Sequence, residues 1–428
     1  MASLMGVCLV VFPVSVLGQG RTWAGTSLAQ MVESARWRIG ALRVNASLSL
    51  TNVGYDSDLY YGHLDEPAPD LTLTASIPVQ ILVPLGKKAV LEINDSPQCV
   101  FYFSTEKERA WDNSFGSRIH FALKRFYIQA GGELSSVRRR MSPELNVNVR
   151  ERSEALDGTL LWQASRNVSF ATLYDHVRYS YGDPEIGGIS PVQALNREEG
   201  YVDLVTYFQP STRLRLFVDG QYGLYTFSEA VATGRNTRSY GVFGGLDFVP
   251  REGETRPVEP VQGSISLGYK RFDVLDAASL DGSGFVGAAD VSVGLFKRTA
   301  ARVFLSRDFE FSVYSDGTYY LSTTYGGGVR RRLSRRATFT YDVSFSQSAY
   351  PQDEAAGPPD DRNFRYTNHL FNLSIQLTRS LAITFQTMLS RRTLGEMGDE
   401  SRRNFFGLSL VYGVPSGSIS APARGLSR

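Results

Sequence analysis

The chain has 428 residues, a formal net charge of +2 and 12% aromatic residues, and its mean hydropathy is -0.18. The small net charge offers no basic field for nucleic acid, and a bundle of membrane-spanning helices would be far more apolar. Length alone does not choose between several soluble domains and one large barrel.

The N-terminus carries an apolar run from Val7 to Leu17, and Gly18 is the small residue expected before a cleavage point. We therefore predict a signal peptide over residues 1–18, although no Lys or Arg precedes the run. The alternative is a buried first strand or helix. Cys8 would leave with the signal, so Cys99 would remain alone and could form no intramolecular disulfide.

A short segment, residues 19–41, precedes the first strand pattern. Thr26 or Ser27 can cap a helix there, with apolar residues spaced along one face at Leu28, Met31, Val32 and Ala35. We expect this segment to be a short helix, too small to be a domain.

From residue 42 to residue 413, apolar and polar residues alternate in long runs. One run sets Ala337, Phe339, Tyr341, Val343 and Phe345 against Thr338, Thr340, Asp342, Ser344 and Ser346. A second run sets Ala301, Val303, Leu305, Phe309, Phe311 and Val313 against Arg302, Ser306, Asp308, Glu310 and Ser312. Each run predicts a strand with one apolar and one polar face.

The lengths of these strands decide which way the apolar face points. A soluble sandwich would turn it inward, but soluble strands average about five or six residues, whereas tilted membrane strands need about 9 to 11. The runs here are longer, so we predict that the apolar face meets lipid and the polar face lines the lumen. No water is present in the hydrocarbon to satisfy outward polar groups.

Two kinds of connection alternate along the chain, tight turns and longer polar loops. The turns recur roughly every 40 to 45 residues, and turns and loops together predict about 18 strands. The fold class we predict is therefore all-β, with a single closed antiparallel transmembrane β-barrel of about 16 to 18 strands over residues 42–413. A C-terminal tail, residues 414–428, follows the barrel.

The last strand resembles the C-terminal signal that the barrel-assembly machinery recognises. Its residues are Phe406, Gly407, Leu410 and Tyr412. The alternative is an ordinary amphipathic strand, since a tail follows and Phe405 stands where a polar residue is usual.

Most of the basic residues are arginines, and five of them are candidates to line the lumen or a turn. They are Arg213, Arg215, Arg302, Arg330 and Arg332. On a lumen wall, arginine can select anions or hold the carboxylate and sulfate groups of sugars. The simpler alternative is that these arginines lie at turns or pair with carboxylates across strands.

No catalytic, metal or cofactor site is predicted. The four histidines, His63, His120, His176 and His369, do not pair with a Ser or a carboxylate at a spacing typical of membrane hydrolases. No Cys or His cluster has metal-ligand spacing, and no Gly-rich phosphate loop follows a strand into a helix. We therefore expect a protein that is not an enzyme.

Three short motifs resemble the "putative beta-barrel porin 2" group of bacterial outer-membrane proteins. They are SLSLTNVGYD (Ser47 to Asp56), which follows RIG (Arg38 to Gly40), then GYKRF (Gly268 to Phe272) and SRDFEFS (Ser306 to Ser312). The resemblance implies an outer-membrane barrel and no established substrate or catalytic residues.

Two functions follow as hypotheses for a barrel in the outer membrane of a Gram-negative bacterium. The first is a porin-like passive channel for small polar or anionic solutes, or an export pore for polysaccharide, because about 16 to 18 strands enclose an aqueous channel unless something plugs it. The second is a structural or adhesive surface barrel with a blocked lumen and partner-binding loops. The expected partners are outer-membrane lipid and the assembly machinery, with no cofactor and no nucleic acid.

Overall fold

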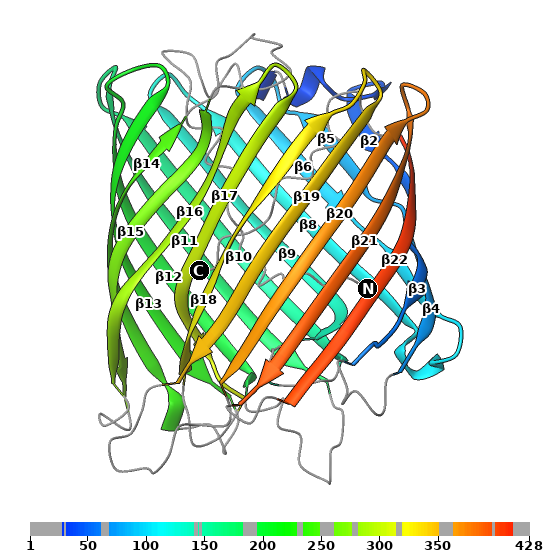
Figure 1. Ribbon diagram of the computed structural model, residues 1–428. Helices are drawn as coiled ribbons and strands as arrows, with labels where there is room; N and C mark the ends of the chain where they lie inside the picture. Colours follow the sequence, from blue (N-terminus) through cyan, green and yellow to red (C-terminus); the bar gives the residue numbers. More distant parts are fainter. Residues whose placement is uncertain are drawn as a thin grey trace.

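The computed structural model describes residues 28–29, 31–60, 68–140, 144, 148–182, 195–228, 234–248, 261–275, 281–313, 319–350, 363–395 and 399–413. These residues form one closed antiparallel β-barrel of 18 strands, which confirms the predicted fold class (Figure 1). The predicted signal peptide and C-terminal tail lie outside the described residues. No helix in this part of the chain is long and apolar enough to cross a membrane.

Three barrel strands near the N-terminus are each bent into two segments. They are β2 (Leu42–Ala46) with β3 (Leu48–Asp56), β4 (Asp70–Ser76) with β5 (Val79–Pro84), and β6 (Ala89–Asp95) with β7 (Gln98–Tyr102). Pro78 and Pro97 lie at two of the bends, where the missing N–H interrupts the ladder. A short strand, β1 (Trp37–Ile39), forms a hairpin with β2, and a 3-10 turn, η2 (Glu106–Glu108), follows β7.

Fifteen continuous strands complete the barrel. They are β8 (Ala110–Ala122), β9 (Phe126–Arg140), β10 (Asn148–Gln163), β11 (Val168–Tyr181), β12 (Arg197–Phe208), β13 (Leu214–Phe227), β14 (Thr237–Phe248), β15 (Val261–Val274), β16 (Gly282–Phe296), β17 (Thr299–Phe311), β18 (Tyr319–Arg332), β19 (Ala337–Ala349), β20 (Phe364–Gln376), β21 (Leu381–Leu394) and β22 (Asp399–Tyr412).

The barrel closes where the last strand pairs with the first. β22 runs antiparallel to β3 from the pair Phe405 and Asp56 to the pair Tyr412 and Leu48, and Figure 1 shows the red β22 beside the blue β3. A bulge with one extra residue in β3 interrupts this seam next to Asn52, which has a positive φ of 53°. Closure pairs the first strand with the last, so the barrel has no open edge along this seam.

The two ends of the barrel differ in their connections. At one end, which we call the turn end, the connections between described strands are two to five residues long, except for the twelve-residue connection between β14 and β15. At the other, which we call the loop end, they reach fifteen residues. The turn end is at the top of Figure 1 and the loop end is at the bottom. Short turns on the periplasmic side and longer loops outside are usual in transmembrane barrels.

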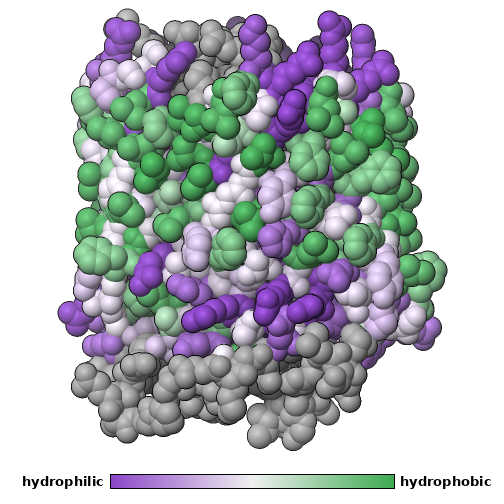
Figure 2. All heavy atoms as spheres, in the orientation of Figure 1, coloured by the Kyte–Doolittle hydropathy of each residue, from purple (hydrophilic) through white to green (hydrophobic). Residues whose placement is uncertain are grey.

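Side chains alternate between the outer surface and the lumen as the sequence predicted. On β13, Leu216, Val218 and Leu224 are exposed on the outer face, while Arg215 is buried on the inner face. Figure 2 shows the result on one face of the barrel, where hydrophobic residues form a broad band and hydrophilic residues gather on both sides of it. Such a band matches the hydrocarbon core of a bilayer.

One part of the predicted alternation is wrong. Val303 and Leu305 of β17 face outward, but Phe309, Phe311 and Val313 do not, because they pack inside the barrel. β17 stops pairing with β16 after Arg307 and continues to Phe311 paired only with β18. The freed end therefore bends into the lumen, and its former outer face packs against the inner wall.

Candidate functional site in the barrel lumen

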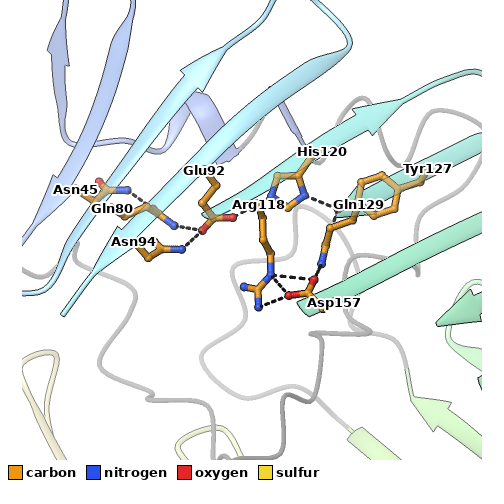
Figure 3. A network of polar contacts seen from close by, with 9 residues as sticks. All are labelled: Asn45, Gln80, Glu92, Asn94, Arg118, His120, Tyr127, Gln129 and Asp157. Atoms are coloured by element: carbon orange, nitrogen blue, oxygen red, sulfur yellow. Dashed lines mark hydrogen bonds and ion pairs between the residues drawn. The ribbon is translucent and has the colours of Figure 1, made fainter. Parts of the chain in front are cut away.

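A hydrogen-bonded polar network covers the inner wall formed by β2, β5, β6, β8, β9 and β10 (Figure 3). Glu92 is at the centre of one half. Its Oε1 accepts hydrogen bonds from Gln80 Nε2 at 2.7 Å and from Asn94 Nδ2 at 3.0 Å, and its Oε2 lies 2.9 Å from His120 Nε2. Asn45 extends the chain by donating to Gln80 at 2.9 Å. The inner wall here is therefore polar, and hydrogen bonds hold its side chains in place.

The other half of this network is built around Asp157 of β10. Arg118 forms an ion pair with Asp157 at 3.1 Å, and Gln129 Nε2 donates to the same carboxylate at 3.1 Å. Tyr127 links the two halves, because its hydroxyl lies 2.8 Å from His120 Nδ1 and donates to Gln129 at 3.2 Å. Arg118 and Asp157 balance each other in this half, so the network presents little unbalanced charge to the lumen.

Two of the predicted arginines lie on the inner wall and are paired. Arg215 forms an ion pair with Asp247 at 2.6 Å, and its guanidinium lies 4.6 Å from the ring centroid of Tyr207. Arg302 donates to both oxygens of Asp290 at 2.7 and 2.6 Å. These pairs join neighbouring strands.

The other three predicted arginines are exposed. Arg213 lies in a turn of the turn end, and Arg332 is at the last position of β18. Arg330 shares the inward face of β18 with Gly328, which stands beside the Asp342 side chain. The structure thus brings Arg302 and Arg330 to one region of the wall, while Arg215 lies on a distant strand.

The N-terminal segment packs inside the turn end of the lumen. Residues 28–29 and 31–33 are helical, and Figure 1 shows this dark-blue segment at the top. Leu28 belongs to a buried apolar cluster, and Met31 and Val32 pack against it. The wall residues of this cluster are Leu82, Val90, Ala122, Tyr127, Leu161, Ala171, Leu173, Val205 and Tyr207. The inner face was expected to be polar, but these inward side chains are apolar because they pack against the helix.

Arg36 attaches the same segment to another part of the turn end. Its Nη2 donates to Ser380 Oγ at 2.8 Å, and its guanidinium lies over the rings of Trp37 and Tyr412 at 5.0 and 5.6 Å. Ser380 lies in the turn between β20 and β21, while the apolar cluster that contains Leu28 includes residues of strands from β5 to β12. The segment therefore crosses part of the turn end of the lumen.

The inward end of β17 narrows the loop end of the lumen. The centroid of the Phe311 ring lies 4.9 Å from that of Tyr225 and 5.0 Å from that of Phe227. The centroid of the Phe309 ring lies 5.1 Å from that of Phe272. Gly282 of β16 makes room for this arrangement, since a Cβ there would overlap the Tyr319 hydroxyl.

Glu144 fixes the residues that follow β17. Its carboxylate accepts hydrogen bonds from Ser312 Oγ at 2.6 Å, from the Val313 N–H at 2.7 Å and from the Tyr350 hydroxyl. Arg235 donates to the Ser312 carbonyl. All of these side chains are buried, so segments far apart in sequence meet inside the loop end.

Another buried carboxylate, Glu108, lies outside the membrane-spanning strands, in the connection after β7. It accepts hydrogen bonds from Arg138 Nε at 3.0 Å, Tyr60 Oη at 2.9 Å and Asn148 Nδ2 at 3.1 Å. Burial raises the pKa of Glu108, but these donors and the Arg138 charge outweigh burial and hold the pKa below its usual value of 4.5. Glu108 is therefore a charged anchor for this connection.

The described residues contain no group of three or more His, Cys, Asp or Glu that could hold a metal ion. His120 is part of the wall network, His369 lies 2.9 Å from the Tyr341 hydroxyl through Nδ1, and His63 lies outside the described residues. The alternation of apolar and polar residues in the sequence predicts neither the position of the N-terminal helix nor the cluster around Glu144. Both depend on contacts between residues far apart in sequence.

A closed 18-strand wall with an apolar exterior and polar inner networks defines a porin-like transmembrane β-barrel of the outer-membrane type. The profile of the family described as "Putative beta-barrel porin 2" matches residues 151–412, which is more than half of the chain. The chain belongs to this family, as the short motifs predicted.

Solved structures of other barrels are similar at low sequence identity. OpdK of Pseudomonas aeruginosa is 8% identical, with a TM-score of 0.49 over 86% of this chain and 98% of that one. OccAB3 of Acinetobacter baumannii is 9% identical, with a TM-score of 0.48 over 86% and 98%. The siderophore receptor PirA of P. aeruginosa is 10% identical, with a TM-score of 0.42 over 86% and 80%. No curated protein sequence matches this chain significantly. At these scores, none of the structures assigns a function.

Proposed function

We propose that the protein is a passive channel for small polar solutes in the outer membrane of a Gram-negative bacterium. The observation that carries this proposal is the polar inner wall, where Glu92, His120 and Asp157 belong to one hydrogen-bonded network. Such a wall offers polar partners to a hydrated solute. In a barrel that holds no water, apolar side chains would fill the lumen instead.

The narrowing at both ends favours small solutes over a polysaccharide chain. The helix that contains Leu28 lies inside the turn end, and the β17 end with Phe311 lies inside the loop end. A solute must pass beside both elements or displace them. We therefore expect low single-channel conductance and a sharp size limit.

Single-channel recording in planar bilayers tests this proposal. The wild-type protein should give small, discrete conductance steps. Leu28→Glu places a charge in the apolar cluster at the turn end, so the helix should leave its position and the conductance should rise. Ser34→Ala is the matched control, because Ser34 is exposed and its hydroxyl bonds only locally to the Met31 carbonyl at 2.9 Å.

The second candidate is a structural or adhesive barrel with a blocked lumen. The apolar packing of Leu28 at one end and of Phe309 and Phe311 at the other supports it. If the wild type and Leu28→Glu are both folded and both fail to conduct, the channel proposal is wrong and the blocked barrel is favoured. Deleting residues 351–362, which spares Tyr350 of the Glu144 cluster, should then abolish binding to a surface partner and leave permeability unchanged.

A further inference from the structure

Three arginines form an exposed patch on the outer surface at the loop end. Arg365 of β20, Arg391 of β21 and Arg402 of β22 are exposed. Arg392 follows Arg391 and is buried, and Arg403 follows Arg402 and is also buried. The side chains of Arg391 and Arg402 are 60% and 62% exposed. By the alternation of each strand, the three guanidiniums lie on the outside of the barrel. We call them the arginine patch.

The strand register brings the arginine patch together. Arg391 is directly opposite Arg402 in the pairing of β21 with β22. Arg365 is opposite Thr393, which is on the same face as Arg391 and two residues from it. Direct cross-strand neighbours have Cβ atoms about 4.5 to 5.5 Å apart, so long side chains on these positions can converge on one group.

The charge of the arginine patch is only partly balanced. Glu400 forms ion pairs with Arg391 at 2.6 Å and with Arg402 at 2.5 Å. Three guanidiniums and one carboxylate leave a local excess of positive charge among these four side chains. Like charges directly opposite each other destabilise a sheet, so this arrangement favours an anion that bridges them.

The arginine patch lies where lipid head groups meet the barrel. Phe385, Leu389 and Phe406 are exposed on the same strands, farther from the loop end. Figure 2 shows hydrophilic residues gathered between the hydrophobic band and the grey loop layer on this face. Hydrocarbon thus covers the apolar residues, and the charged groups reach the interface.

We propose that the arginine patch binds the phosphate groups of a phosphorylated glycolipid in the outer leaflet. Guanidinium binds phosphate through paired N–H donors, and the adjoining apolar surface suits acyl chains. A symmetric contact with a second copy of the chain is disfavoured, because a two-fold axis would bring two positively charged patches together.

Binding of purified, folded protein in a neutral detergent to defined lipids tests this proposal by native mass spectrometry. The probes are lipid A with two phosphates, lipid A with its phosphates removed, and phosphatidylcholine. The variant R365Q/R391Q/R402Q should bind two-phosphate lipid A at least about tenfold more weakly, since each basic residue near an anionic surface contributes about fivefold. E400Q should bind it more tightly, because Glu400 is the carboxylate that pairs with two arginines of the arginine patch within the described strands.

R178Q is the matched control. Arg178 is an exposed arginine on β11 with a side chain 59% exposed, and Glu198 balances it at 3.6 Å. This variant should keep wild-type affinity. The proposal is overturned if the triple variant binds two-phosphate lipid A as wild type does, if phosphate-free lipid A binds equally well, or if wild type forms oligomers that the triple variant loses without lipid. Heat-dependent gel mobility confirms that each variant is folded.

Discussion

The buried ion pair that joins the first and last strands provides a quantitative test of the structure. Arg403 of β22 donates through Nε to both oxygens of Asp56 of β3 at 2.9 and 3.0 Å, and its Nη2 bonds to the same carboxylate. The Asp56 side chain is fully buried and the Arg403 side chain is 7% exposed. The pair therefore joins the two strands of the seam at a site that bulk water does not reach.

Asp56→Ala should lower the free energy of unfolding by about 3 to 5 kcal/mol, because it removes the carboxylate that forms an ion pair with the buried Arg403 guanidinium. The attraction in the intact pair is about 5 kcal/mol at 3 Å with an effective dielectric constant of about 20, and desolvation of both charges offsets much of it. Asp56→Leu with Arg403→Met should therefore return close to wild-type stability, within about 1 to 2 kcal/mol.

Urea unfolding of the protein in lipid vesicles, followed by tryptophan fluorescence, measures these differences. Asp273→Ala is the control, because its ion pair with Arg271 is much more exposed and should cost less than about 1 kcal/mol. A loss below about 1 kcal/mol in Asp56→Ala would refute the inference that the pair is buried. A double variant as unstable as Asp56→Ala would show that packing at the seam, and not an unpaired charge, sets the cost.

Three further predictions concern selectivity, packing and pH. Arg330→Gln should shift the reversal potential in a salt gradient toward cation preference, while Arg331→Gln, on the opposite face of β18, should leave it unchanged. Gly54→Ala should cost about 1 to 3 kcal/mol in urea unfolding, because its Cβ would overlap the backbone of β22, while Gly220→Ala meets open space and should be nearly neutral. Since the folded pKa of Glu108 is lowered, its stabilisation is present above the unfolded value of 4.5 and is lost as pH falls through the folded pKa. The protection factors of the amides in residues 103–109, which are corrected for the slower intrinsic exchange in acid, should therefore fall over that range. Glu108→Gln should weaken that pH dependence, and an unchanged profile would contradict the assigned role.

The alternation in the sequence correctly predicts which face of most strands points outward. Leu216 and Val218 on one side of β13 and Arg215 on the other follow from a period of two, which depends only on local backbone geometry. The connections between strands depend on local chemistry as well. For that reason the strand number and the closed barrel were predictable from turns and loops alone.

The residues that fill the barrel interior depend on contacts that form only in the folded chain. Phe309 and Phe311 continue the apolar face of β17 without a break, yet they pack in the lumen because β16 no longer pairs with β17 beyond Arg307. Leu28 likewise lies against strands that are distant in the sequence. Alternation specifies the face of a strand relative to its neighbours, whereas the path of an unpaired end depends on contacts across the lumen that close only when the whole barrel has formed.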